Sequence, residues 1–343
     1  MKIFKKILKL LLIFLAVIII WNFKLISYGI DQLKGQLHIV MSAQPIEQVL
    51  KDPKLKPDFK RKLLLIAEIK KFAVDSLGLK NTDNYTTYYD QLNKPVLWVL
   101  TACEPFSLKA YQWHFPFLGN VSYKGFFILQ KGKKELAELK KKGYDTDLSP
   151  TGGWSTLGWF KDPVLSNFLK RPDGRIAETI IHELTHATVY LKSSVDYNEN
   201  LATFVGEKGA EKFLAYKYGA GSKELLEYSN YKSDEDLYGK HLLKGAALLD
   251  SLYHSFKMEN IPGNQKIFLK YKLITEILLG INKENFYNKE IYRFRFGKDP
   301  LPNNTEFMSN LRYRKKQDDF EKEFHEKCNG NLKTFVKSII QRY

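Results

Sequence analysis

The spacing of apolar residues predicts a helical first part of the chain, over residues 25–81. Apolar residues recur at helical spacing from Leu33 to Met41, and Pro53 and Pro57 then interrupt the pattern. A second helical pattern begins near Asp58 and ends at Gly78, where glycine is a typical helix stop. We therefore expect two helices joined by a proline-containing turn.

The pattern changes over residues 82–160, where short apolar runs rich in β-branched and aromatic residues predict strands. The expected strands cover residues 96–102, 110–115, 121–129 and 154–160, with one helix near 133–142. From Asp173 the periodicity is again helical. The expected helices cover residues 173–190, 198–218, 222–256, 264–280 and 303–340. The predicted fold is α+β and predominantly helical, with a small mixed β-sheet packed on the 173–218 helix pair and a helical part over 222–343.

The N-terminus carries an unbroken apolar run from Leu10 to Trp21, preceded by four lysines. Extending the run from Ile7 to Leu25 brings it near the roughly twenty residues of a membrane span. No small-x-small cleavage site follows, so residues 1–24 predict an uncleaved membrane anchor in preference to a cleaved signal peptide or a buried helix. The lysines predict that this end stays in the cytoplasm. Residues 25–343 would then be exported and held at the periplasmic face of the cell envelope.

Composition and charge narrow the possible functions. The chain has 343 residues, 44% of them hydrophobic, which is enough to fill a core. The net charge is +16, but the lysines are scattered in short surface-type runs, so we expect no nucleic-acid partner. Cys103 and Cys328 are far apart and in no CxxC motif, which excludes a zinc knuckle or a redox pair. Whether they form a disulfide is left open by their spacing.

The motif His182-Glu183-Leu184-Thr185-His186 predicts a metal site. Residues four apart share a helix face, so both histidines can reach one zinc ion at about 2.0–2.1 Å. The Glu183 carboxylate would lie beside the metal and take a proton from zinc-bound water, whose pKa zinc lowers towards about 7. The short pattern also occurs by coincidence on ordinary helices. The residues next to the motif are uncharged, and no proline or glycine interrupts the helix, which favours a true zinc site over coincidence. We expect one Zn²⁺ per chain.

A catalytic zinc needs a third protein ligand and one open position. Lys192 occupies the place of the third histidine in metzincins, which excludes that class. A carboxylate on the next helix is the other common solution, and Glu199 has the spacing for it. Glu207 and Asp196 are alternatives. Glu178 and Thr203 could orient the ligands, or they could be ordinary solvated residues.

Further blocks resemble one known family and extend over nearly the whole chain. They are Gly35–Leu37, Gln44–Ile46, Ala102–Phe106, Tyr123–Phe127, Ser155–Phe160, Asp162–Leu165, Asn198–Val205, and Asn303-Asn304 with Tyr313. In these blocks the sequence resembles the bacterial putative aminopeptidase family, predicted zinc peptidases of the cell envelope. The resemblance implies a gluzincin-type site, with His182, His186 and Glu199 as ligands and Glu183 as general base. Many relatives resemble lipoproteins, but this sequence has no cysteine near the apolar run, so its attachment would be through that run.

Residues that handle the substrate are harder to choose. A substrate strand could add to an exposed sheet edge at Gly153–Trp159, or at Tyr123–Phe127. The resemblance places Tyr313 in a C-terminal block, which makes it the candidate donor to the oxyanion. The alternatives are His241, His254 and His325. A carboxylate that would bind a substrate's α-ammonium could be Glu104, Asp162 or Glu207.

Together these features predict an exported, membrane-anchored zinc metallopeptidase, an aminopeptidase by its resemblance. Its partners would be a peptide or protein substrate and the membrane, through the N-terminal helix. The alternatives are a zinc endopeptidase of the same mechanism and a non-catalytic, zinc-stabilised envelope protein. The presence of Glu183 favours an enzyme, because a structural zinc site needs no general base.

Overall fold

A computed structural model describes residues 4–7, 9, 20–116, 119–151, 161–192, 194–259, 261–295, 297, 299–308 and 317–342. The longer helices are α2 (Phe23–Ser42), α4 (Pro57–Leu77), α5 (Leu129–Lys141), α6 (Asp173–Thr188), α7 (Val195–Tyr218), α8 (Lys223–Met258), α9 (Gly263–Ile281), α12 (Gln317–Glu326) and α13 (Leu332–Arg342). Short helical turns are α3 (Ile46–Val49), α10 (Lys289–Tyr292) and the 3₁₀ turn η1 (Phe168–Lys170). The chain is α+β and mainly helical, as predicted.

The strands are short and form small sheets. They are β1 (Gln44–Pro45), β2 (Thr87–Tyr89), β3 (Trp98–Cys103), β4 (Trp113–Phe115), β5 (Gly119–Val121), β6 (Lys124–Phe126), β7 (Asp145–Pro150) and β8 (Val164–Leu165). The sheet β6-β3-β7 is antiparallel, with Leu100 opposite Lys124 on one side and Leu148 on the other. In the sheet β1-β2-β8, β2 and β8 run parallel. β4 and β5 form a separate antiparallel pair.

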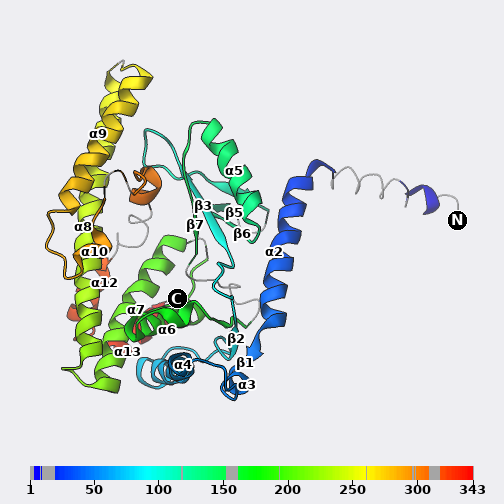
Figure 1. Cartoon of the computed structure of the whole chain (residues 1–343), viewed down its shortest axis with the longest axis vertical. Coiled ribbons are helices and arrows are strands. Elements are labelled where there is room, and N and C mark those ends of the chain that lie inside the picture. Colours follow the sequence, from blue (N-terminus) through cyan, green and yellow to red (C-terminus); the bar gives the residue numbers. More distant parts are fainter. Residues whose placement is uncertain are drawn as a thin grey trace.

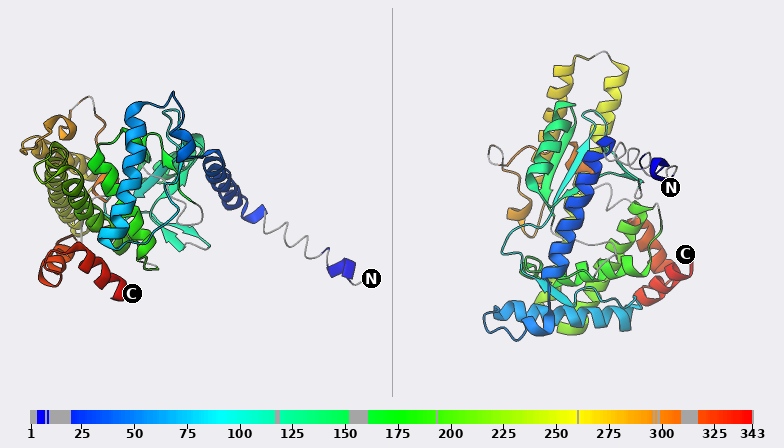
Figure 2. Two further views of the ribbon diagram at one scale, coloured as in Figure 1. Left: turned by 90° about the horizontal axis from the view of Figure 1, so that it is seen from below. Right: turned by 90° about the vertical axis from the view of Figure 1, so that its right-hand side faces the viewer.

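Helices surround these sheets on several sides (Figure 1). The long α8–α9 hairpin stands at one edge, α5 lies against the β3 sheet, and α6 and α7 lie below that sheet. A view from the side shows α2 crossing the sheet and α4 along the base (Figure 2). The largest apolar core joins α4, α6, α7, α12 and α13, and smaller cores join α8 to α9 and α5 to the sheet.

A buried polar network joins the sheet to the α8–α9 hairpin. Lys270 of α9 is buried and its Nζ contacts the Asp145 carboxylate at 2.5 Å and donates to the Pro105 carbonyl oxygen at 3.0 Å. Asn304 is also buried; its backbone N–H donates to Asp145 at 2.9 Å, and its side-chain oxygen accepts from Tyr253 at 2.7 Å. These hydrogen bonds join the residues around Pro105 and the end of β7 to α8 and α9.

Several predicted boundaries differ from the observed ones. The strand expected at 121–129 is split between β5 and β6, and its last residue, Leu129, already begins α5. β7 was not expected, because the sequence from Asp145 to Pro150 is poor in strand-forming residues. It forms by pairing with β3 along its whole length. The helix expected at 303–340 is broken between α12 and α13, where Asn329 and Gly330 both have positive φ. The strand expected at 154–160 lies outside the described residues.

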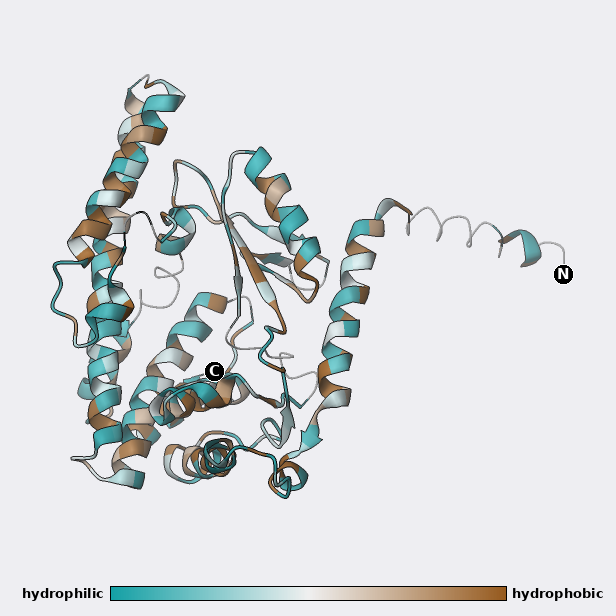
Figure 3. Cartoon of the chain, in the orientation of Figure 1, coloured by the Kyte–Doolittle hydropathy of each residue, from teal (hydrophilic) through white to brown (hydrophobic). Residues whose placement is uncertain are grey.

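The predicted membrane anchor is corrected by the structure. Within the described residues, no helix is both long enough and apolar enough to cross a bilayer. α2 is long enough, but Lys24, Asp31 and Lys34 make it too polar, and hydrophilic and hydrophobic residues alternate along it (Figure 3). The predictions of a membrane-anchoring N-terminal helix, of the membrane as a partner, and of a membrane-attached periplasmic location were therefore wrong. Residues 10–19 of the apolar run lie outside the described part of the chain.

The two cysteines are buried and free. Cys103 lies at the end of β3, whereas Cys328 belongs to the core around α12 and α13. Burial, and to a lesser degree the nearby Asp145 charge, raise the pKa of the Cys103 thiol to about 12.

Candidate functional site

Helix α6 presents the His182-Glu183-His186 motif on one side and packs into the core with the other. Ile176, Ile180 and Ile181 are fully buried and form its inner face. The two histidines and Glu183 lie outside that stripe and are only half-buried. The helix ends at Thr188, and Val189 is extended, so the chain turns away directly after the motif.

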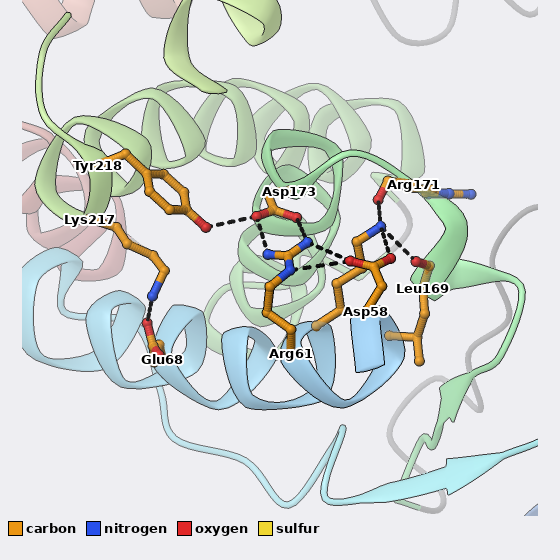
Figure 4. Close-up of polar contacts among 9 residues, drawn as sticks. Asp58, Arg61, Glu68, Leu169, Arg171, Asp173, Lys217 and Tyr218 are labelled. Atoms are coloured by element: carbon orange, nitrogen blue, oxygen red, sulfur yellow. Dashed lines mark hydrogen bonds and ion pairs between the residues drawn. The ribbon is translucent and has the colours of Figure 1, made fainter. Parts of the chain in front are cut away.

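The start of α6 is fixed by an ion pair with α4 (Figure 4). Arg61 donates to both oxygens of Asp173 at 2.6 and 2.9 Å, and the Tyr218 hydroxyl donates to the same carboxylate at 2.7 Å. Burial raises the pKa of Asp173, but the bonds from Arg61 and Tyr218 outweigh it, and the net shift is downward. A carboxylate in the first turn is also favourable for the helix dipole. Close by, Lys62 of α4 donates to the carbonyl oxygens of Leu169 and Arg171, both at 2.9 Å.

Two glycines allow α7 to approach α6 closely. A Cβ placed on Gly206 would lie 2.9 Å from the Glu178 carbonyl oxygen, and one on Gly209 would lie 2.8 Å from Ile181 Cγ2. Both distances are below normal contact, so any larger residue would push the helices apart. The close crossing is what brings Glu199, near the start of α7, to the histidine face of α6.

The loop between the two helices is held by Asn198. Its side-chain amide donates to the Leu191 carbonyl oxygen at 2.8 Å, and its side-chain oxygen accepts from the Leu191 N–H at 2.9 Å. Asn198 is buried and directly precedes Glu199. These two hydrogen bonds hold the loop against the first turn of α7, directly before Glu199.

His182, His186 and Glu199 converge on one point. The two Nε2 atoms are 3.1 Å apart, and each is 3.6 Å from a Glu199 carboxylate oxygen. The two 3.6 Å distances end on different oxygens of the Glu199 carboxylate. Ligand atoms about 2.0–2.1 Å from a tetrahedral zinc are separated by about 3.3 Å, so the observed separations are close to those that such an ion requires. Two imidazoles and a carboxylate are also a typical zinc donor set. Among the described residues, no other trio of His, Cys, Asp or Glu is so arranged.

The charged groups at this point shift one another's pKa values. Burial raises the pKa of Glu199, but the two histidines beside its carboxylate hold that pKa well below its usual range. Burial lowers the pKa of His182, and Glu199 and Glu183 more than offset this, so that the pKa is raised. Burial is the main reason that the pKa of Glu183 is raised, and Glu199 and Asp162 add to it. Within the described residues, His186 Nδ1 is buried and has no hydrogen-bond partner.

The structure separates the other predicted residues from this point. Of the carboxylates considered as a third ligand, Glu207 pairs with Lys232 of α8, and Asp196 is not part of the converging group. Glu178 accepts from the Tyr228 hydroxyl at 3.1 Å, and its charge acts on His182. Thr203 lies half-buried one turn after Glu199.

Two of the three alternative donors have other partners. His241 contacts Glu284 and the Ile277 carbonyl oxygen, His325 contacts Glu321, and His254 is exposed on α8. Tyr313 and the proposed edge strand at 153–159 lie outside the described residues. The other proposed edge, near Tyr123, includes the edge strand β6.

The sequence did not point to Asn198 as a loop clamp, to the glycines of α7, or to Tyr85. Tyr85 lies before β2, far from α6 in sequence, yet the charges of Glu183 and Asp162 both act on its hydroxyl. Of the three candidates for binding an α-ammonium, Asp162 is the one whose charge contributes to the raised pKa of Glu183. Glu104 pairs instead with Lys109, at 3.7 Å.

Comparison with known proteins supports one family. No curated protein and no solved structure is detectably similar to the chain. Residues 27–342, which include all the elements described above from α4 to α13, match the model of a family described as putative aminopeptidase. Because the match covers most of the sequence, the chain belongs to the putative aminopeptidase family.

Proposed function

We propose that the protein is a zinc-dependent peptidase that removes residues from the amino end of peptides. The observation that carries the proposal is the convergence of His182, His186 and Glu199 beside Glu183. The description of the family supports peptide bonds as the target and the amino end of the peptide as the place of cleavage. We take residues 25–343 as the peptidase domain.

In this proposal the site is of the gluzincin type, with two histidines from one helix and a glutamate from the next. His182, His186 and Glu199 would hold the ion. When bound, zinc supplies Lewis acidity, which polarises a carbonyl oxygen and lowers the pKa of water towards about 7. A catalytic zinc takes three protein ligands and keeps its fourth position for water, which this set of three residues would match.

Glu183 is the proposed general base. Its carboxylate makes no hydrogen bond or ion pair with any described residue, so its oxygens remain available to a water molecule. Glu183 would take a proton from the water that attacks the peptide carbonyl carbon and deliver it to the nitrogen of the departing amine. Tyr313 stays a prediction as a donor to the oxyanion.

The proposal is tested by the substitution Glu183→Gln, which keeps the shape of the side chain and removes its basicity. Purified wild-type protein should hold about one zinc per chain and should cleave a library of peptides, each prepared with a free and with an acetylated amino end. The variant should retain the zinc and lose hydrolysis by a factor of about 10² or more. Glu227→Gln, an exposed glutamate on α8, is the matched control and should behave as wild type.

Mass spectrometry of the products separates the two modes of cleavage. Loss of single residues from free amino ends alone would support an aminopeptidase, whereas internal cuts in acetylated peptides would establish an endopeptidase. Activity that survives in Glu183→Gln would contradict the proposed mechanism.

A further inference from the structure

A hollow lies between the α8–α9 hairpin and the chain that follows it. It is bounded by α8, the end of α9, α10 and the residues up to 306, and α10 lies beside the hairpin (Figure 1). Its volume is about 480 Å³, within the roughly 300–1,000 Å³ of small-molecule sites. Among the described residues that line it, none belongs to α6 or α7. The hollow is therefore a candidate binding site separate from the metal-ligand helices.

One wall of the hollow is apolar and belongs to a packed core. Leu278 and Ile281 of α9 and Tyr292 of α10 line the hollow and are also buried in the core that joins α8 to α9. Tyr238 of α8 lines it beside Tyr292, with the two ring centroids 5.4 Å apart. Side chains that are already packed lose little freedom when a ligand binds. This wall can therefore receive an apolar body such as an alkyl chain or a ring.

The chain on the other side of the hollow is held by polar side chains. Asn282 follows α9; its amide donates to the Phe294 carbonyl oxygen at 3.1 Å, and its side-chain oxygen accepts from the Phe294 N–H at 2.9 Å. The buried Asp234 of α8 accepts from the backbone N–H groups of Tyr287 and Asn288 at 2.7 and 2.8 Å. These bonds fix the chain before and after α10, so the hollow is formed before any ligand binds.

The charged residues of the lining leave an excess of negative charge. They comprise three carboxylates, Glu290, Asp299 and Glu306, and two guanidinium groups, Arg293 and Arg295. Arg295 lies 3.2 Å from Asp299, and Arg293 lies 3.9 Å from Glu290. Three negative and two positive charges leave one net negative charge when all five groups are ionised. The lining therefore favours a cation over an anion.

Glu306 is the carboxylate best placed to receive that cation. It is half-buried, and its Oε1 accepts from the Tyr238 hydroxyl at 3.2 Å. Burial raises the pKa of Glu306, and the bond from Tyr238 offsets this only in part. A cation beside such a carboxylate stabilises its ionised form, and the faces of aromatic rings attract cations as well. Glu306 and Tyr238 thus place both kinds of cation-binding group in one hollow.

We propose that this hollow binds a small organic cation, an ammonium group carried on an apolar chain or ring. The ammonium would lie at the Glu306 carboxylate and the Tyr238 ring, with the apolar body against Leu278 and Ile281. Hydrogen bonds between an ammonium and a carboxylate are stronger than those between neutral groups, so charge should decide which ligand is selected. The site is independent of the proposed zinc chemistry.

Titration calorimetry of the full-length protein with hexylamine, hexanol and hexanoate tests the preference for a cation, because the three compounds share one alkyl chain. At pH 7 the amine is protonated, since alkylammonium groups like that of lysine have a pKa of about 10.4. We expect hexylamine to bind at least about tenfold more tightly than hexanol, and hexanoate to bind most weakly. Binding of hexanol or hexanoate as tight as that of hexylamine, or no binding of hexylamine, would overturn the proposal.

Glu306→Gln removes the charge and keeps the shape of the side chain. The variant should bind hexylamine at least about tenfold more weakly, while its affinity for hexanol stays within about twofold of wild type. Glu276→Gln, at an exposed glutamate of α9 outside the lining, is the matched control and should keep the wild-type affinity for both. An unchanged affinity for hexylamine in Glu306→Gln would mean that the amine binds elsewhere.

Labelling of the wild-type protein locates the site even if Glu306→Gln folds poorly. An alkylamine that carries a diazirine should attach, on illumination, to peptides containing residues 289–295 or 299–306, and excess hexylamine should suppress this labelling. The same labelling should persist in Glu199→Ala, because no candidate metal ligand lines the hollow. Labelling confined to peptides of α6 and α7 would place the amine in the candidate peptidase site and contradict the proposal.

Discussion

His182 and Gly206 lie in contact across the crossing of α6 and α7: a Cβ on Gly206 would be only 3.2 Å from His182 Cβ. The same added atom would also meet the Glu178 carbonyl oxygen at 2.9 Å. A backbone oxygen cannot move aside as a flexible side chain can. The geometry of the candidate metal site therefore depends on a residue of α7 that has no side chain.

Gly206→Ala should separate the two helices and move Glu199 away from the histidines. We expect destabilisation of about 1–3 kcal/mol, typical of overpacking, together with weaker zinc binding. Urea unfolding and competition with a zinc chelator measure the two effects. Gly221→Ala is the control, because a Cβ there has open space around it. Wild-type stability and zinc affinity in Gly206→Ala would show that the crossing is not tight.

The ion pair at the start of α6 predicts a dependence of stability on pH. The pKa of Asp173 is lowered in the folded protein, so its stabilising contribution is complete above the unfolded value of about 3.9 and is lost as the pH falls through the folded value. Arg61→Met removes the main cause of the shift. The variant should be less stable at pH 7 by about 1–2 kcal/mol, because Arg61 is half exposed, and the difference should shrink below about pH 4.

Urea unfolding of wild type and Arg61→Met at several pH values measures this difference. Arg293→Met, at an exposed pair with Glu290, is the control and should change little at any pH. A stability difference that is the same at pH 3 and pH 7 would assign the effect of Arg61 to packing and not to charge.

The cysteines should remain reduced and protected. Cys103 is fully buried and its pKa is raised to about 12, so almost none of it is thiolate at pH 8. Iodoacetamide should modify neither cysteine in the folded protein. After unfolding without a reductant it should modify both, adding two groups to the intact mass. Failure to label in the unfolded state would indicate a disulfide and contradict the fold.

The parts of the fold that follow from local spacing could be predicted, and those that depend on distant contacts could not. The spacing of apolar residues predicted α4, α8 and α9 to within a few residues. β7 could not be predicted, because it has no strand-like sequence and exists only through its register with β3. The break between α12 and α13 rests on two left-handed residues, one of them Asn329.

The candidate site also combines features that follow from local spacing with features that depend on distant contacts. His182, Glu183 and His186 lie within two turns of one helix, so their spacing alone indicates a common face. Glu199 could be inferred as a ligand because a short loop joins α6 to α7 and Glu199 lies near the start of α7. By contrast, the left-handed backbone at Tyr85 and its hydrogen bond to the Asp162 carbonyl oxygen leave no pattern in the sequence.

The central claim is that His182, His186 and Glu199 together bind one zinc ion. Metal analysis of purified Glu199→Ala beside Glu207→Ala tests it most directly, because both residues are on α7 and only one belongs to the converging group. We predict about one zinc per chain in wild type and Glu207→Ala, and loss of most of it in Glu199→Ala. Stoichiometric zinc in Glu199→Ala would contradict the account.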